Sequence, residues 1–343
     1  MGIAQAPAFA PTMPRGLPLD LWDARVPADN PLTEEKVALG RRLFFEKRLS
    51  MDGTVACSTC HDPDKGFADG RRVSAGVGGR FGVRNSPSLS NVVFNEFQFW
   101  DGRASSLEEQ AKSPMTNAIE MGMADHTAVV SVIAQDPAYV ADFLKVFGRA
   151  PKIEDTVAAI ATFERTILSG DSKFDRFMAG EPLGMSEPAQ RGWFLWNDKA
   201  RCNTCHPFSS VTPNFTDSKF HNIGVAAKGR DLASLFRGTP TDPELGRFAV
   251  TRQVVDLGSF KTPGLRDVAL TAPYMHDGSV ATLLDVVDFY DRGGEPNRYL
   301  DQLIRPLKLT HAEKHDLVAF MESLTGEGAG AANRSTLRDP AKK

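Results

Sequence analysis

Two short motifs carry the clearest chemistry in this 343-residue chain. Each reads Cys-x-x-Cys-His, at residues 57–61 and 202–206, and together they contain all four cysteines of the sequence. This spacing is typical of c-type haem attachment, in which two thiols bond covalently to one haem and the histidine gives the iron an axial ligand. The sequence therefore predicts two covalent c-type haems, attached through Cys57, Cys60, His61, Cys202, Cys205 and His206.

Two other kinds of site use paired cysteines. A zinc ribbon needs four cysteines at one metal, whereas these pairs lie about 145 residues apart and each is followed by a histidine. A redox-active dithiol does not need the adjoining histidine. Both alternatives fit the sequence less well than two haems.

Composition limits the classes of protein. The net charge of −3 gives no reason to expect a nucleic-acid partner. No apolar run approaches the roughly 18–20 residues of a membrane span. The uncharged, Ala- and Pro-rich residues 1–12 resemble a processed N-terminus of an exported protein. Because c-type haem attachment takes place outside the bacterial cytoplasm, we expect a periplasmic location.

The chain reads as mostly α, with long loops. Helical patterns are expected near residues 34–45, 127–147, 153–168, 189–197 and 280–290, and Thr310 begins a capping-box pattern before a further helix. Each half has the order helix, haem motif, loop, closing helix, so we expect two cytochrome c-like domains that each enclose one haem. The predicted division is a flexible N-terminus (1–20), a domain with the first haem (21–168), a domain with the second haem (169–327) and a disordered tail (328–343).

Further motifs lie between and after the haem motifs. They are WDGR at residues 100–103, LEEQ at 107–110, Glu120, and PYMHDG at 273–278. In these residues and in their order, the chain resembles the bacterial di-haem cytochrome c peroxidase family, and within it the MauG-like branch (MauG/MbnH-type). The resemblance covers roughly residues 30–327.

The resemblance implies roles for single residues. Trp100 would relay electrons between the haems, Glu120 would be the acid/base for peroxide cleavage, and Gln110 and Pro114 would line the same distal pocket. The positions expected to hold a calcium ion are Asn85, Thr271 and Pro273. Without the resemblance, these side chains have plainer interpretations, such as core packing for Trp100 and a solvated helix surface for Glu120 and Gln110.

Two departures favour the MauG-like branch. Conventional peroxidases carry a histidine in the loop after the first haem motif that caps the first iron, but residues 74–79 here read SAGVGG. The first haem is therefore expected to be open in every oxidation state. The position of the methionine that binds the second iron in conventional members is Tyr290 here. An anionic phenolate favours the higher oxidation states of iron.

These observations lead to three functional hypotheses. In the first, hydrogen peroxide reacts at the open haem, two oxidising equivalents are stored over both haems, and a side chain of a partner protein, with tryptophan preferred, is oxidised. In the second, the same chemistry only removes peroxide, with a small redox protein as electron donor. In the third, the chain only carries electrons, which the missing loop histidine argues against. The sequence identifies neither the partner nor the oligomeric state.

Overall fold

The computed structural model describes residues 9–232, 234 and 242–327, and the tail predicted for 328–343 lies outside this part of the chain. Helices joined by long loops make up most of it, so the mostly α fold expected from the sequence is confirmed. The helices are α1 (Leu19–Ala24), α2 (Glu34–Phe44), α3 (Cys57–Cys60), α4 (Leu107–Thr116), α5 (His126–Ala134), α6 (Pro137–Phe147), α7 (Ile153–Glu164), α8 (Lys173–Met178), α9 (Glu187–Asn197), α10 (Phe248–Thr251), α11 (Leu283–Asp291) and α12 (His311–Glu322).

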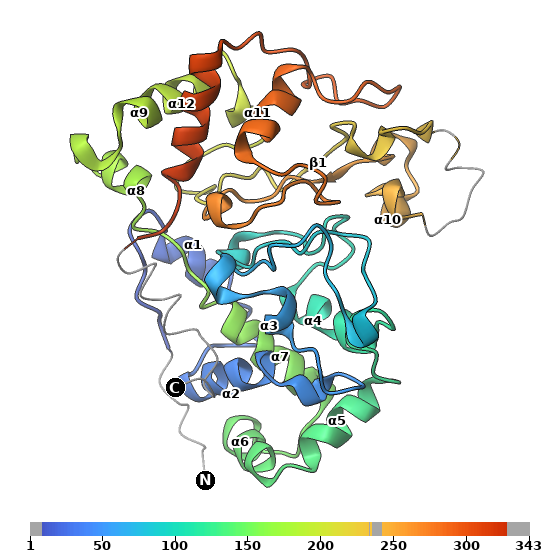
Figure 1. The fold of residues 1–343 in the computed structure, drawn as a ribbon. Helices are drawn as coiled ribbons and strands as arrows, with labels where there is room; N and C mark the ends of the chain where they lie inside the picture. Colours follow the sequence, from blue (N-terminus) through green and yellow to red (C-terminus); the bar gives the residue numbers. More distant parts are fainter. Residues whose placement is uncertain (1–8, 233, 235–241, 328–343) are drawn as a thin grey trace.

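The helices gather into two groups (Figure 1), with α2, α5, α6 and α7 at one end and α8, α9, α11 and α12 at the other. Each group has its own buried apolar cluster, the first ending along the chain at Ile167 and the second beginning at Phe174. We infer from this separation that the chain forms two cytochrome c-like units divided near residue 168.

Each unit is built around one close helix crossing. In the first, α2 crosses α7 where a Cβ on Gly40 would lie 1.9 Å from the carbonyl oxygen of Ala159. In the second, α9 crosses α12 where a Cβ on Gly192 would lie 2.0 Å from the carbonyl oxygen of Asp316. Only glycine permits such an approach of two backbones, so Gly40 and Gly192 allow the two crossings.

Helix ends follow local signals. Thr310 and Glu313 form the capping box expected before α12. The segment expected to be helical over 127–147 is instead two helices, because Pro137 has no amide hydrogen and starts α6 with Asp136 as its N-cap.

The long segment between the second haem motif and α11 contains the only strands of the described residues. Strands β1 (Phe220–His221) and β2 (Phe260–Lys261) pair antiparallel, with Phe220 opposite Lys261. The Lys261 amide also donates to the carbonyl oxygen of Trp100, 2.8 Å away. This short sheet therefore ties the second unit to the loop before α4.

Residues 9–20 differ from the flexible segment expected for 1–20, of which residues 1–8 lie outside the described chain. Leu17 and Trp22 are buried in a cluster with Leu168, and the Trp22 indole donates to the carbonyl oxygen of Arg165. Apolar side chains in this segment hold it against the fold.

Candidate active site

The first haem motif opens into a cavity of about 420 Å³. Cys57, Cys60 and His61 line it, and among the described residues around this cavity His61 is the only histidine. Both thiols are free of disulfide bonding. Helix α3 presents the two cysteines one turn apart, which is the spacing that two bonds to one haem need.

The second haem motif opens into another cavity, of about 260 Å³. Cys202, Cys205 and His206 line it in the same way, and these cysteines also form no disulfide. Each Cys-x-x-Cys-His motif therefore faces its own cavity.

The two motif histidines are held alike. The His61 Nδ1 lies 3.1 Å from the carbonyl oxygen of Phe67, and the His206 Nδ1 lies 2.8 Å from that of Phe215. A hydrogen bond from Nδ1 to a carbonyl fixes the tautomer in which Nε2 is the free ligand atom. Burial lowers the pKa of both rings, that of His206 to about 4, so each imidazole is neutral as an iron ligand must be.

Both carbonyls are presented from a rare backbone conformation. Phe67 has a φ of 57° and Phe215 a φ of 55°, although both side chains are fully buried aromatic rings. A bulky residue in the left-handed region is strained and persists where the surrounding structure demands it. The repeated strain supports the same role for both histidines.

The three residues expected at the distal pocket meet in the first cavity. Glu120, Gln110 and Pro114 all line it, the last two from α4. The Glu120 Oε1 accepts a hydrogen bond of 3.0 Å from the Asn117 side chain. Burial raises the pKa of Glu120, with Arg103 partly opposing it, so this carboxyl is suited to both hold and release a proton.

The loop at residues 74–79 closes the same cavity. Ser74 and Gly76 line it, and the Val77 amide donates to the carbonyl oxygen of Glu120 over 3.0 Å. This hydrogen bond holds the backbone of Glu120 in place. The loop contains no histidine that could bind the first iron.

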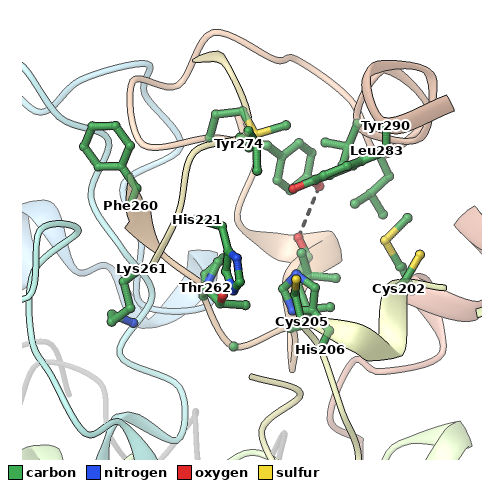
Figure 2. Close-up of a pocket in the computed structure, with 18 of the residues that line it drawn as sticks. Cys202, Cys205, His206, His221, Phe260, Lys261, Thr262, Tyr274, Leu283 and Tyr290 are labelled. Atoms are coloured by element: carbon green, nitrogen blue, oxygen red, sulfur yellow. Dashed lines mark hydrogen bonds between the residues drawn. The ribbon is translucent and has the colours of Figure 1, made fainter. Parts of the chain in front are cut away.

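Tyr290 lines the second cavity from α11. Figure 2 shows Tyr290 and His206 on opposite sides of this pocket, with Cys202 beside them. The hydroxyl of the neighbouring Tyr274 donates to the carbonyl oxygen of Val268 over 3.1 Å, whereas the Tyr290 hydroxyl has no hydrogen bond among the described residues. Met275 and Met321 line the cavity as well, so two thioethers are also present. Tyr290 and His206 therefore face the same cavity from opposite sides.

Trp100 lies between the two cavities and lines both. Its indole Nε1 donates to the Asn85 carbonyl oxygen over 2.9 Å, which fixes the ring. A fixed indole that contacts both sites is well placed to carry electrons between them.

The three residues expected to bind calcium also come together. Asn85, Thr271 and Pro273 all line the second cavity. The Asn85 side-chain nitrogen donates to the carbonyl oxygen of Arg71 over 2.9 Å, which leaves its Oδ1 as the ligand atom. Amide and carbonyl oxygens are the donors that calcium prefers, so calcium binding here is a proposal that the geometry permits.

Comparison with known proteins gives the family of this chain. The family model described as "Di-haem cytochrome c peroxidase" matches residues 34–182. Methylamine utilization protein MauG of Methylorubrum extorquens is 41% identical over 305 residues, which cover 88% of this chain and 82% of MauG. This chain belongs to the di-haem cytochrome c peroxidase family. The family resemblance expected from the sequence is thereby confirmed, and the chain is a di-haem oxidoreductase.

Other members of the di-haem cytochrome c peroxidase family are similar over comparable lengths. Cytochrome-c peroxidase IdrP1 of Denitromonas iodatirespirans is 39% identical over 321 residues, covering 88% of this chain and 84% of that protein. The crystal structure of a MauG-like protein associated with microbial copper homeostasis has a TM-score of 0.81 and 34% identity, covering 99% of this chain and all of the other (100%). The relatives therefore include proteins named MauG or MauG-like and proteins named cytochrome c peroxidase.

The residues around both cavities fit the two haems of this family. Each cavity contains a pair of unbridged thiols and a neutral imidazole with its Nε2 free. We expect the double variant Cys57→Ala/Cys60→Ala to keep one covalent haem, and the matched variant Cys202→Ala/Cys205→Ala to keep the other. A pyridine haemochrome assay and a haem-stained denaturing gel measure this. Protein that contains zinc in place of haem would contradict the assignment.

Two charged residues of these cavities carry no signal in the sequence. Glu164 lines the first cavity with its Oε2 buried and unpartnered among the described residues, and burial raises its pKa to about 8. Lys261 lines both cavities. Glutamate in a helix and lysine in a strand are usually solvated. Only the tertiary structure therefore shows that Glu164 and Lys261 line the cavities.

Proposed function

We propose that this protein is a periplasmic, MauG-like oxidoreductase that uses hydrogen peroxide to oxidise a side chain, with tryptophan preferred, of a partner protein. The observation that carries this proposal is the Tyr290 hydroxyl, which lies free of hydrogen bonds among the described residues in the same cavity as His206. A phenolate ligand would stabilise a highly oxidised second haem, as a slow reaction with a bulky protein substrate requires.

The two haems, when bound, supply the iron at which peroxide reacts and the two electrons that its reduction needs. The protein supplies the proton path. Glu120 takes a proton from the near oxygen of peroxide and returns it to the far oxygen as the O–O bond breaks, and Gln110 orients the peroxide by hydrogen bonding. The far oxygen then leaves as water, two further protons at the near oxygen complete the second water, and the partner side chain restores the two electrons.

Trp100 would connect the two haem sites, so that both can hold the oxidising equivalents. Because its ring lines both cavities and its Nε1 donates to the Asn85 carbonyl oxygen, Trp100 would carry electrons between the two haems when they are bound. The partner protein can then bind at the surface of the enzyme and does not need to enter the cavity where peroxide reacts.

An open first haem has a direct test. We expect cyanide to bind the fully ferric protein without prior reduction, because His61 is the only histidine around the first cavity among the described residues. Electron paramagnetic resonance of the same protein should show one high-spin and one low-spin haem. Two low-spin haems and no cyanide binding would mean that a side chain, such as the buried Met121 of that cavity, caps the iron.

Peroxide removal with a small electron-donor protein is the alternative function. It is favoured by relatives named cytochrome c551 peroxidase, of which that of Pseudomonas aeruginosa is 35% identical over 300 residues. The two functions differ in how the enzyme behaves after it has reacted with one equivalent of peroxide. A protein-oxidising enzyme stays oxidised for seconds or longer without a partner, whereas a scavenger turns over rapidly with reduced cytochrome c.

The periplasmic location is part of the proposal. It rests on the two Cys-x-x-Cys-His motifs, since covalent haem attachment takes place outside the bacterial cytoplasm. Among the described residues, no helix has the length and apolar character needed to cross a membrane. Fractionation of the native host, with haem staining of the periplasmic fraction, tests the location.

A further inference from the structure

Lys261 is a buried cation at the junction of the two cavities. Its side chain belongs to a residue that is 9% exposed, and it lines both the cavity of the first haem motif and that of the second. Figure 2 shows it across the second pocket from Cys202, on the side where β2 enters. Trp100 is among the few other residues that line both cavities.

The ammonium of Lys261 has neither a hydrogen-bond acceptor nor an ion-pair partner among the described residues. Burial alone lowers its pKa to about 8, with no carboxylate raising it. A buried ammonium without an anion is costly, and proteins keep one where a partner, a ligand or a cofactor compensates the charge. The missing anion is therefore expected to enter the cavities from outside the chain.

The position of Lys261 is fixed by its backbone. Its amide donates to the carbonyl oxygen of Trp100 over 2.8 Å, and it pairs with Phe220 across the two-stranded sheet. The neighbouring cation, His221, already has its anions, since its ring nitrogens lie 2.6 Å from Asp301 and 3.0 Å from Asp217. Lys261 is the cation that lines both cavities among the described residues, and its ammonium is left for a ligand.

The geometry points to a specific partner for this cation. We propose that the Lys261 ammonium binds a haem propionate at the junction of the two cavities and, through that bond, raises the reduction potential of the haem that carries it. The thioether edges of both haems are taken by the cysteines, and the propionates are the carboxylates that each haem brings. This proposal rests on the two haems of the family and not on the proposed protein substrate.

The direction of the effect follows from electrostatics. A nearby cation stabilises the reduced iron, which has one positive charge fewer, relative to the oxidised iron. Because Lys261 is only 9% exposed, the effect of its charge is weakly screened. Lys261 is therefore a positioning and tuning residue, and it takes no part in moving the peroxide protons.

The test is a potentiometric titration of the purified di-haem protein in the absence of peroxide. We expect Lys261→Met to lower the potential of at least one haem, so that its oxidised-to-reduced ratio at a fixed potential rises about tenfold, which equals 59 mV for a one-electron couple. Lys261→Arg keeps the charge and should retain most of the wild-type potential. Lys219→Met removes the same charge from an exposed site nearby and should leave both potentials unchanged.

A second readout identifies the propionate itself. Resonance Raman spectra should show a shifted propionate bending band in Lys261→Met and a restored band in Lys261→Arg. If Lys261→Met does not retain both haems, the number of haems per chain is compared between the variants. Two haems in Lys261→Arg but fewer in Lys261→Met support the propionate bond. Loss of haem from both variants overturns the proposal. Potentials and propionate bands in Lys261→Met that match those of Lys219→Met also overturn the proposal. Neither outcome depends on which substrate the enzyme oxidises.

Discussion

Replacing Glu120 with glutamine is expected to slow the reaction with hydrogen peroxide by about 10²–10⁴-fold, the usual contribution of a general acid/base. The glutamine amide keeps the shape and the position beside Asn117, but it cannot take and return a proton. Burial raises the pKa of the Glu120 carboxyl, which suits this group to take and return a proton. Stopped-flow mixing of the ferric protein with peroxide measures the rate.

Two controls make this result specific. Glu154→Gln changes the same charge at a more exposed position on α7 and should react at the wild-type rate. Gln110→Ala should have a smaller effect than Glu120→Gln, because Gln110 would orient the peroxide without transferring a proton. If the rate of Glu120→Gln falls less than about threefold while both haems remain, another group moves the proton, and the buried Glu164 would be tested next.

Replacing Tyr290 with phenylalanine is expected to change the spectrum of the second haem and to abolish the long-lived oxidised state. The change removes one oxygen, and that oxygen has no hydrogen bond among the described residues, so the fold loses little. The first cavity is untouched, and peroxide should still react there at close to the wild-type rate. Optical and electron paramagnetic resonance spectra, before and after one equivalent of peroxide, measure both effects.

Tyr274→Phe is the matched control for Tyr290→Phe. Both tyrosines line the second cavity, but the Tyr274 hydroxyl is committed to the carbonyl oxygen of Val268. Its loss should affect stability and leave the iron spectrum unchanged. A second-haem spectrum that is the same in Tyr290→Phe and wild type would remove the phenolate assignment and point to Met275 or Met321 as the iron ligand. It would also favour peroxide removal over protein oxidation.

Local sequence accounts for the haem motifs and for much of the helical framework. A Cys-x-x-Cys-His motif brings two thiols and an imidazole together within one short turn, so five consecutive residues determine the chemistry. The capping box at Thr310 is short-range in the same sense. Pro137 is a local signal for a helix start, because proline is favoured at the first helical position. The continuous apolar pattern over 127–147 instead predicts a single helix.

The arrangement around the two cavities depends on the tertiary structure. Trp100 and Lys261 are far apart in the chain, and only the contact of β2 with the loop before α4 places both between the cavities. Sequence patterns assign lysine and glutamate to solvent because that is where most of them lie. Whether a given charge is buried, and which anion must then compensate it, is decided by surfaces that meet only when the two halves of the chain have folded together.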